Sequence, residues 1–255
     1  MGYGADSLPL GVEMKPYYEE AGITIYHGDC RDILPELTRV DAVIADPPYN
    51  ARLVYGESVN DNRTWEEYIE WLKPIIEICE SLSDGPVFVF LSVNGLLEIT
   101  RVKRPRHIAV WDKPMSFSPR LGGSAFLPHW EPCAIFGKVW GEGGKVPDWH
   151  ISDVWHHNPS LRNGHPCPKP YPLLMQIIGA MPAKKILDPF MGSGTTLVAA
   201  KNLGREASGI EIEERYCEIA ANRLRQSVFN FEERMPNKPV QPVCLFADEE
   251  MEAIA

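Results

Sequence analysis

Short runs of apolar residues alternate along this chain with segments of helical periodicity. The residues Val87-Phe88-Val89-Phe90-Leu91 are apolar at every position, which is typical of a strand buried on both faces. Alternating strands and helices predict a mostly parallel sheet covered by helices on both sides. The predicted strands are Ile23–His27, Ala42–Ala45, Val87–Val93, Ile108–Asp112, Cys133–Phe136, Lys185–Asp188 and Ala207–Ile212.

Helical patterns separate several of these strands. Thr64 and Glu67 have the spacing of a capping box, and apolar residues then recur at helical period as far as Cys79. Gly204 follows another such segment and is typical of a helix C-terminus. Further helices are predicted at 171–180, Thr195–Leu203 and Glu213–Val228.

The length of 255 residues and the 44% hydrophobic content suit one large α/β domain. We expect an irregular N-terminal arm at 1–21, the main domain at 22–230, and a flexible acidic tail at 231–255. Residues 139–164 are rich in Gly, Pro and His and break the strand–helix pattern. We predict that they form a small inserted loop region.

Several classes of protein are excluded by composition. No apolar run approaches the length of a membrane span, and no signal peptide is expected. The six cysteines contain no C-x-x-C pair, so neither a disulfide framework nor structural zinc is predicted and a cytoplasmic location is expected. The loop histidines 150, 156, 157 and 165, with Cys167, match no standard metal-ligand pattern.

The formal net charge of −10 does not mark an obvious nucleic-acid binder. Net charge, however, reports solubility and steering and does not describe a local surface. The densest basic stretch, Arg101–His107, is compatible either with phosphate contacts or with a solvated loop. Charge alone therefore leaves the partner open.

An acid, two prolines and an aromatic residue follow the predicted strand Ala42–Ala45. Asp46 and Pro47 each precede a proline and are therefore held in extended geometry. We expect a rigid ledge at the carboxyl edge of the sheet, where α/β proteins place their sites. The Asp46 carboxylate and the Pro47 carbonyl could accept both hydrogens of a ring NH2 group, and Tyr49 could stack on the ring. Taken alone, a proline-terminated strand with an ordinary turn explains these residues equally well.

A glycine-containing turn joins the strand Lys185–Asp188 to the next helix. Gly192 and Gly194 would let a ligand approach the backbone closely, and the helix N-terminus offers free N–H groups. Glu211 ends the following strand and is placed to bind ribose hydroxyls, although a helix dipole also favours an acid there. Together these features indicate a nucleotide-like ligand.

Three motifs of this sequence, taken in their order along the chain, resemble those of the amino-methylating DNA methyltransferases. They are Asp46–Tyr49, the stiff segment His165–Pro170, and Asp188–Thr196. The catalytic motif precedes the cofactor loop, which resembles the circularly permuted β group, and the resemblance covers roughly residues 15–228. One departure is Cys167-Pro168, where the family often carries Thr-Gln or Ala-Gln.

The resemblance implies a Rossmann-like sheet of about seven mostly parallel strands with an antiparallel edge hairpin. It also implies S-adenosylmethionine (AdoMet) as methyl donor, S-adenosylhomocysteine as product, and no metal. The residues implied to be catalytic are Asp46, Pro47, Pro48 and Tyr49. Those implied to bind AdoMet are Asp29, Cys30, Asp46, His165, Lys169, Asp188, Phe190, Gly192, Ser193, Gly194, Thr195, Thr196, Glu211 and Ile212.

Within this family, an Asp at the first position of the Asp46–Tyr49 motif is typical of enzymes that methylate adenine N6. The resemblance therefore implies a site-specific methyltransferase acting on a flipped-out adenine in double-stranded DNA. Cytosine-N4 methylation in the same fold is the alternative, and RNA or protein substrates or a non-catalytic AdoMet- or DNA-binding module are more remote ones. The small insertion at 139–164 predicts a short recognition sequence, weak specificity, or help from a second copy in a homodimer. The sequence does not choose between an enzyme paired with a restriction endonuclease and one acting alone.

Overall fold

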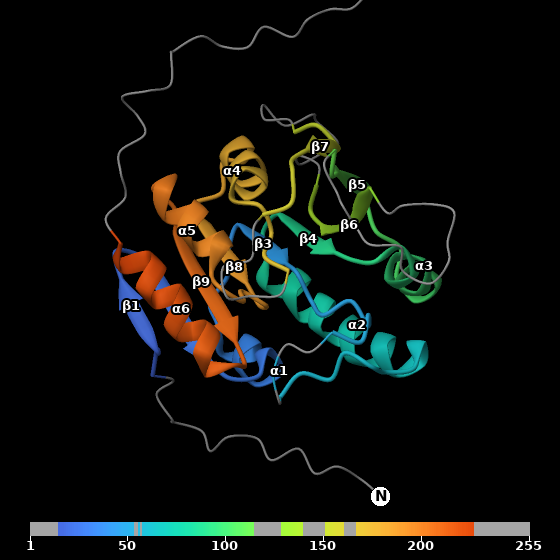
Figure 1. Ribbon diagram of the computed structural model, residues 1–255, viewed down its shortest axis with the longest axis horizontal. Coiled ribbons are helices and arrows are strands. Elements are labelled where there is room, and N and C mark those ends of the chain that lie inside the picture. Colours follow the sequence, from blue (N-terminus) through green and yellow to red (C-terminus); the bar gives the residue numbers. More distant parts are fainter. Residues whose placement is uncertain are drawn as a thin grey trace, which may run out of the picture.

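The sheet at the centre of the molecule has the strand order β1-β2-β9-β8-β3-β4-β6-β5-β7 (Figure 1). The computed structural model describes residues 15–53, 56, 58–114, 129–139, 151–160 and 167–226, and its nine strands lie within these ranges. They are β1 (Tyr18–Glu20), β2 (Ile23–His27), β3 (Ala42–Ala45), β4 (Pro86–Phe90), β5 (His107–Asp112), β6 (Trp130–Gly137), β7 (Val154–His156), β8 (Lys185–Asp188) and β9 (Glu206–Glu211).

Helices cover both faces of the sheet. The helical elements are α1 (Cys30–Ile33), the 3-10 turn η1 (Leu34–Glu36), α2 (Trp65–Leu82), α3 (Val93–Val102), α4 (Tyr171–Ala180), α5 (Thr195–Asn202) and α6 (Glu214–Arg225). One hydrophobic cluster packs α4, α5 and α6 on one face, and a second packs α1, α2 and α3 on the other. This three-layer arrangement confirms the predicted α/β fold.

Strand β3 shows why its sequence is apolar at consecutive positions. Ala42 and Ile44 belong to the cluster with α4–α6, whereas Val43 and Ala45 belong to the cluster with α2. All four residues are buried. Because successive side chains of a strand point to opposite faces, a strand covered on both sides must be apolar throughout.

Strand direction decides which residues meet at the site. Strands β2, β9, β8, β3 and β4 run parallel, while β6 runs antiparallel to both β4 and β5. The start of β6 therefore lies at the sheet edge where the parallel strands end. The antiparallel hairpin was expected at the outer edge of the sheet. The antiparallel strands β5 and β6 do not end the sheet, because β7 pairs with β5 on its outer side.

Two strands lie in segments for which irregular structure was expected. Strand β1 lies within 1–21, because the positive φ angles of Ala21 and Gly22 form a tight turn that pairs Tyr18–Glu20 with β2. Strand β7 lies within 139–164, where Trp155 is fully buried and the strand pairs with β5.

Helix α3 was not predicted. It begins after Ser92, whose side chain accepts a hydrogen bond from the Gly95 N–H, and it contains the start of the basic stretch. The acidic tail at 231–255 lies outside the described residues, and the division into arm, domain and tail remains a prediction. Within the described ranges, no helix has both the length and the apolar character needed to cross a bilayer.

Candidate active site

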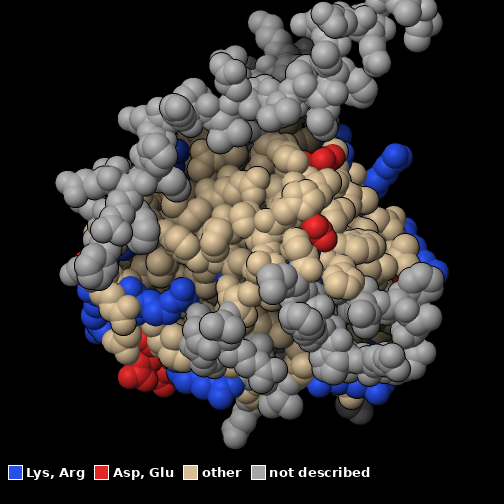
Figure 2. Space-filling view, turned by 45° about the horizontal axis from the view of Figure 1, so that its top comes forward, with Lys and Arg blue, Asp and Glu red and all other residues tan. Residues whose placement is uncertain are grey.

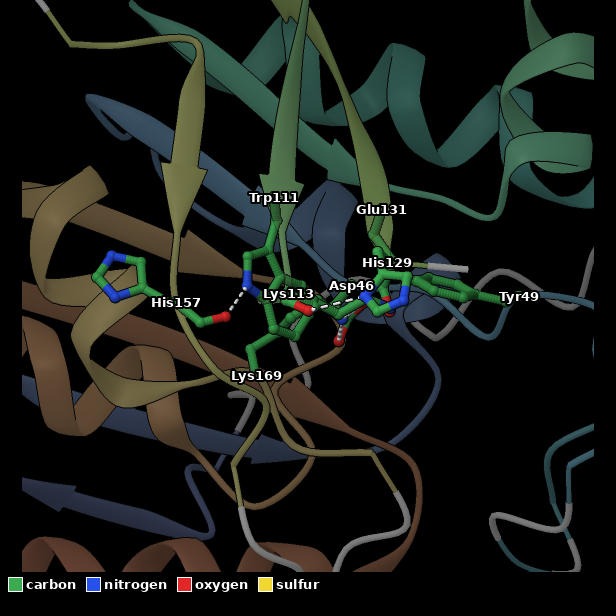
Figure 3. Close-up of polar contacts among 8 residues, drawn as sticks. All are labelled: Asp46, Tyr49, Trp111, Lys113, His129, Glu131, His157 and Lys169. Atoms are coloured by element: carbon green, nitrogen blue, oxygen red, sulfur yellow. Dashed lines mark hydrogen bonds and ion pairs between the residues drawn. The ribbon is translucent and has the colours of Figure 1, made fainter. Parts of the chain in front are cut away.

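The carboxylate that follows β3 is held by a lysine from a distant part of the chain (Figure 3). Lys169 Nζ lies 2.7 Å from each carboxylate oxygen of Asp46. The Lys169 side chain is only 9% exposed. A single ammonium group thus donates to both oxygens of the acid that the sequence marked as catalytic. Lys169 itself was expected to bind the cofactor.

A second acid and a second lysine extend this cluster. Glu131, at the start of β6, accepts from Lys113 Nζ at 2.8 Å and from the Tyr49 hydroxyl at 3.1 Å. Its other contact is Lys169 Nζ, 3.6 Å from Glu131 Oε2. The cluster therefore contains two carboxylates and two ammonium groups, so its charges can balance.

Sequence reasoning missed Glu131 and Lys113 as site residues. The available signal was a charged residue at the end of each of two strands, Lys113 directly after β5 and Glu131 near the start of β6. Pairing of Trp111 with Glu131 across β5 and β6 brings these charges to the site edge. That pairing was not specified by any motif.

The pKa values in the cluster follow from burial and from opposing charge. Burial is the largest influence on Asp46 and its pKa is raised, although the Lys169 ammonium acts to lower it. Burial lowers the pKa of Lys169, but Asp46 and Glu131 outweigh it and the pKa is raised. Burial likewise raises the pKa of Glu131, yet Lys169 and Lys113 bring it below its ordinary value. Lys169 is therefore held as an ammonium group and Glu131 as a carboxylate.

Aromatic rings surround the Lys169 ammonium. Its Nζ lies 5.0 Å from the Tyr49 ring centroid, 5.2 Å from Phe90 and 5.7 Å from Trp111. Such distances allow cation–π attraction, which is strongest where water is excluded. The Trp111 indole N–H donates to the His157 carbonyl at 2.7 Å, which fixes this wall of the cage (Figure 3).

Two buried carboxylates lie at the ends of β8 and β9. Asp188 accepts from the Phe190 N–H at 3.0 Å, and burial raises its pKa to about 7. Glu211 accepts from the N–H groups of Gly192 at 3.0 Å and Glu213 at 2.8 Å. Burial also raises the pKa of Glu211 to about 7, against these hydrogen bonds. Glu211, which was predicted to bind ribose hydroxyls, is therefore hydrogen-bonded directly to the glycine turn.

Asp29 caps the short helix α1. Its side chain accepts from the Arg31 N–H at 2.9 Å and also pairs with the Arg31 guanidinium. Burial raises the pKa of Asp29, but these bonds outweigh it and the pKa is lowered. The neighbouring Cys30 is buried, and burial raises the pKa of its thiol. Asp29 is therefore an ionised acceptor at the site edge.

One cavity of about 900 Å³ joins the two halves of the site. It is lined by Asp29, Cys30, Asp46, Pro47, Pro48, Tyr49, Lys169, Asp188, Phe190, Gly192, Ser193, Thr195, Thr196, Glu211 and Ile212. All of these were expected from the sequence. The additional lining residues include Trp71, Trp111, Lys113, Glu131 and Tyr216.

Two expected cofactor residues are not among those that line the cavity. His165 lies outside the described residues. Gly194 is turned toward α6, where an added Cβ would lie 2.6 Å from Ala220 Cβ. With a φ of +75°, Gly194 allows the tight turn and the close packing of α5 on α6. Its role in cofactor binding stays a prediction.

The segment after Tyr49 is organised by a buried acid. Asp61 accepts from the N–H groups of Asn50 at 2.6 Å, Ala51 at 3.1 Å and Leu53 at 2.9 Å. Further along, the Ser58 N–H donates to Glu213 Oε1 at 2.9 Å. Of the described residues of this segment, Leu53, Ser58 and Arg63 are among those that line the cavity.

Other candidates lie apart from the cavity. Arg101 pairs with Glu98 and Lys103 pairs with Glu80, near the end of β5 opposite the site. Among the described residues, no group of three His, Cys, Asp or Glu side chains is arranged to hold a metal ion.

Comparison with known proteins fits this geometry. The DNA methylase family of N6 and N4 enzymes matches residues 134–222. The Type II methyltransferase M.ScaI of Streptomyces caespitosus is 29% identical over 270 residues, spanning 84% of this chain and 86% of that protein. The crystal structure of the M1.HpyAVI–SAM complex is 27% identical with a TM-score of 0.58, covering 80% of this chain and 99% of that one. These similarities support the assignment of this chain to the N6/N4 DNA methylase family.

The N6/N4 family resemblance inferred from the three motifs is thereby confirmed. PvuII DNA methyltransferase, described as cytosine-N4-specific, shares the fold with a TM-score of 0.65 at 16% identity, covering 88% of this chain and 93% of that one. The fold of the N6/N4 family is thus compatible with an enzyme for the other base, and it does not decide the base used here.

Proposed function

We propose that this chain transfers a methyl group from AdoMet to the N6 amino group of adenine in DNA. The observation that carries the proposal is the shared cavity of about 900 Å³, which joins the Asp46–Tyr49 ledge to the turn between Asp188 and Glu211. A volume of this order is typical of ligand sites. The relatives named as Type II methyltransferases support methyl transfer as the reaction.

The residues of the cofactor half fit AdoMet. Glu211 is buried and lines the cavity beside Gly192, where the lack of a side chain leaves room for a ligand. We assign Glu211 to the ribose hydroxyls and Asp29 to the adenine ring. The carboxylates of the site also favour a cationic sulfonium. When bound, AdoMet supplies an electrophilic methyl group.

The chain's own residues prepare the amino group. Its lone pair is delocalised into the base, so the nitrogen is a weak nucleophile. Hydrogen bonds from its two hydrogens to the Asp46 carboxylate and the Pro47 carbonyl favour a more pyramidal nitrogen. The positive charge that develops on this nitrogen is stabilised by the Asp46 carboxylate. Alignment of the reacting atoms within the cavity adds a proximity effect.

The base must leave the duplex stack to reach this ledge, at a cost of a few kcal/mol. Stacking on the Tyr49 ring can return about 1–3 kcal/mol. The Tyr49 hydroxyl is held by Glu131, so the ring is fixed before the base arrives. In Figure 2 Lys and Arg side chains lie mainly around the edge of the largely tan face, with a few Asp and Glu side chains on the face and at its lower left edge. The basic edge is compatible with an approaching phosphate backbone.

Adenine is proposed because Asp46 opens the ledge motif, as is typical of the N6 enzymes that this chain resembles. Cytosine N4 is the second candidate, favoured by the fold shared with the cytosine-N4-specific PvuII enzyme. We further propose that the DNA is double-stranded and that a second copy of the chain assists sequence recognition.

The decisive experiment is incubation of the purified protein with AdoMet and unmethylated DNA of varied sequence, followed by mass spectrometry of the nucleosides. N6-methyladenine is expected. N4-methylcytosine would overturn the choice of base and keep the site assignment. Absence of any methylated base, with AdoMet binding intact, would overturn DNA methylation by the chain alone.

A further inference from the structure

We propose that Lys169 is a positioning residue for Asp46: it fixes the catalytic carboxylate as a charged acceptor and is not a contact to AdoMet. The inference rests on the proposed methyl transfer. The inference also goes beyond the proposed function, because the family resemblance places Lys169 among the cofactor-binding residues.

The first argument is the geometry of the pair. One ammonium group lies 2.7 Å from both oxygens of Asp46. Two charge-assisted bonds from one donor atom fix the plane of the carboxylate. Each oxygen keeps a further lone pair, so the carboxylate can still accept a hydrogen from the target amino group.

The second argument is the way the donors of Lys169 are used. An ammonium group has three N–H donors, and two of them are directed at Asp46. The remaining charge faces Glu131, 3.6 Å away, within the cage formed by Tyr49, Phe90 and Trp111. The protein itself therefore satisfies Lys169, which leaves little for the carboxylate of AdoMet.

The third argument is the effect of burial on Asp46. Burial favours the neutral acid, and Lys169 is the largest influence in the opposite direction. A protonated Asp46 would present a donor to the amino group at one oxygen and could not stabilise the developing positive charge. Without Lys169, the pKa of Asp46 would rise further and the active form would be lost at neutral pH.

The test compares Lys169→Met with Lys138→Met, an exposed lysine whose side chain is 68% exposed, as the matched control. In Lys169→Met, methyl transfer near neutral pH should fall at least about 30-fold, and the acid limb of its pH profile should move up by about one pH unit or more. AdoMet affinity should stay within about 3-fold of wild type. Lys138→Met should change none of these.

Loss of AdoMet affinity as the main effect, or loss of activity with an unshifted pH profile, would overturn the proposal. Lys169→Met leaves buried acids unbalanced, so the double variant Asp46→Asn/Lys169→Met guards against misfolding. It should bind AdoMet as tightly as Asp46→Asn alone. A fall of more than about tenfold between these two would assign Lys169 to the cofactor.

A readout independent of activity separates this inference from the proposed function. The carboxyl carbon of Asp46 can be followed by ¹³C NMR in protein labelled at aspartate and assigned with Asp46→Asn. Its titration midpoint should lie higher in Lys169→Met than in wild type, even if wild type methylates no DNA. An unchanged midpoint would overturn the role of Lys169, whatever the substrate.

Discussion

The hydroxyl group of Tyr68 donates a hydrogen bond to the carbonyl oxygen of Pro48, 2.9 Å away. Tyr68 is a fully buried residue of α2, and burial raises the pKa of its hydroxyl, so it remains a donor. The catalytic ledge is therefore supported by a helix on one side and held by Lys169 on the other. The prolines restrict the chain locally, and α2 anchors that rigid piece to the core.

Tyr68→Phe should lower the free energy of unfolding by about 1–2 kcal/mol, because the Pro48 carbonyl loses its buried donor. Urea denaturation measures this change. Tyr17→Phe is the control, since its ring lies at the surface. Equal effects of the two substitutions would mean that the hydrogen bond contributes nothing.

Asp46→Ala should abolish methyl transfer, with a loss of at least about 100-fold, and leave AdoMet binding in place. The carboxylate acts on the target amino group, whereas the cofactor half of the cavity is built around Glu211 and Asp188. Single-turnover assays and calorimetry give the two quantities, with Asp84→Ala on the exposed surface as control. A folded Asp46→Ala protein that no longer binds AdoMet would contradict this division of roles.

AdoMet should bind more tightly as the pH rises from about 6 to about 8, by up to about tenfold per pH unit below the pKa. Burial raises the pKa of Glu211 to about 7, and only its ionised form offers all its lone pairs to ribose hydroxyls. Calorimetry across this range measures the slope. Glu211→Gln should bind AdoMet more weakly, and its AdoMet affinity should depend less on pH. The pH dependence that remains would come from Asp188, whose pKa is also about 7. The same slope in both proteins would refute the assignment.

Asp61→Ala should loosen the segment that follows Tyr49. Three N–H groups, of Asn50, Ala51 and Leu53, would lose their acceptor, at about 0.5–1.5 kcal/mol for each hydrogen bond lost. Hydrogen exchange should accelerate at these amides while the sheet stays protected. Asp61→Asn retains one acceptor oxygen and should show an intermediate effect. Unchanged exchange in Asp61→Ala would show that the acid does not order the segment.

Comparison of Gly194→Ala with Gly204→Ala separates the cost of backbone strain from the cost of a steric clash in the unfolding free energy. Both glycines have positive φ, +75° and +65°, so each substitution carries about 1–2 kcal/mol of backbone strain. An added Cβ meets Ala220 at position 194 and open space at position 204. Gly194→Ala should therefore cost about 1–3 kcal/mol more in unfolding free energy. Similar costs would show that α5 and α6 adjust freely.

Strands buried on both faces could be predicted from the sequence because burial forces consecutive apolar residues, as in β3 and β4. The short outer strands β1 and β7 lack that pattern, and they depend on a turn at Ala21-Gly22 and on pairing with β5. Helix α3 depends on a single serine cap. Elements with weak local signals were thus the ones missed.

The residues of the candidate site likewise fall into two groups, those that local motifs predicted and those that only the folded chain brings together. Asp46, Tyr49, Asp188 and Glu211 lie within or beside motifs whose spacing encodes their placement. The ion pair of Lys169 with Asp46 spans 123 positions of the chain, and no local pattern encodes it. Glu131 reaches the cluster only because β6 is antiparallel.

The antiparallel direction of β6 has a consequence for the connection between β5 and β6. The connection between β5 and β6 both leaves and re-enters the sheet at the catalytic edge, where the Lys113 N–H donates to the His129 carbonyl at 2.6 Å. This hydrogen bond joins the residues on either side of the connection directly to each other. Replacement of the residues between Lys113 and His129 should therefore leave the pairing of β5 with β6, and with it the position of Glu131, in place.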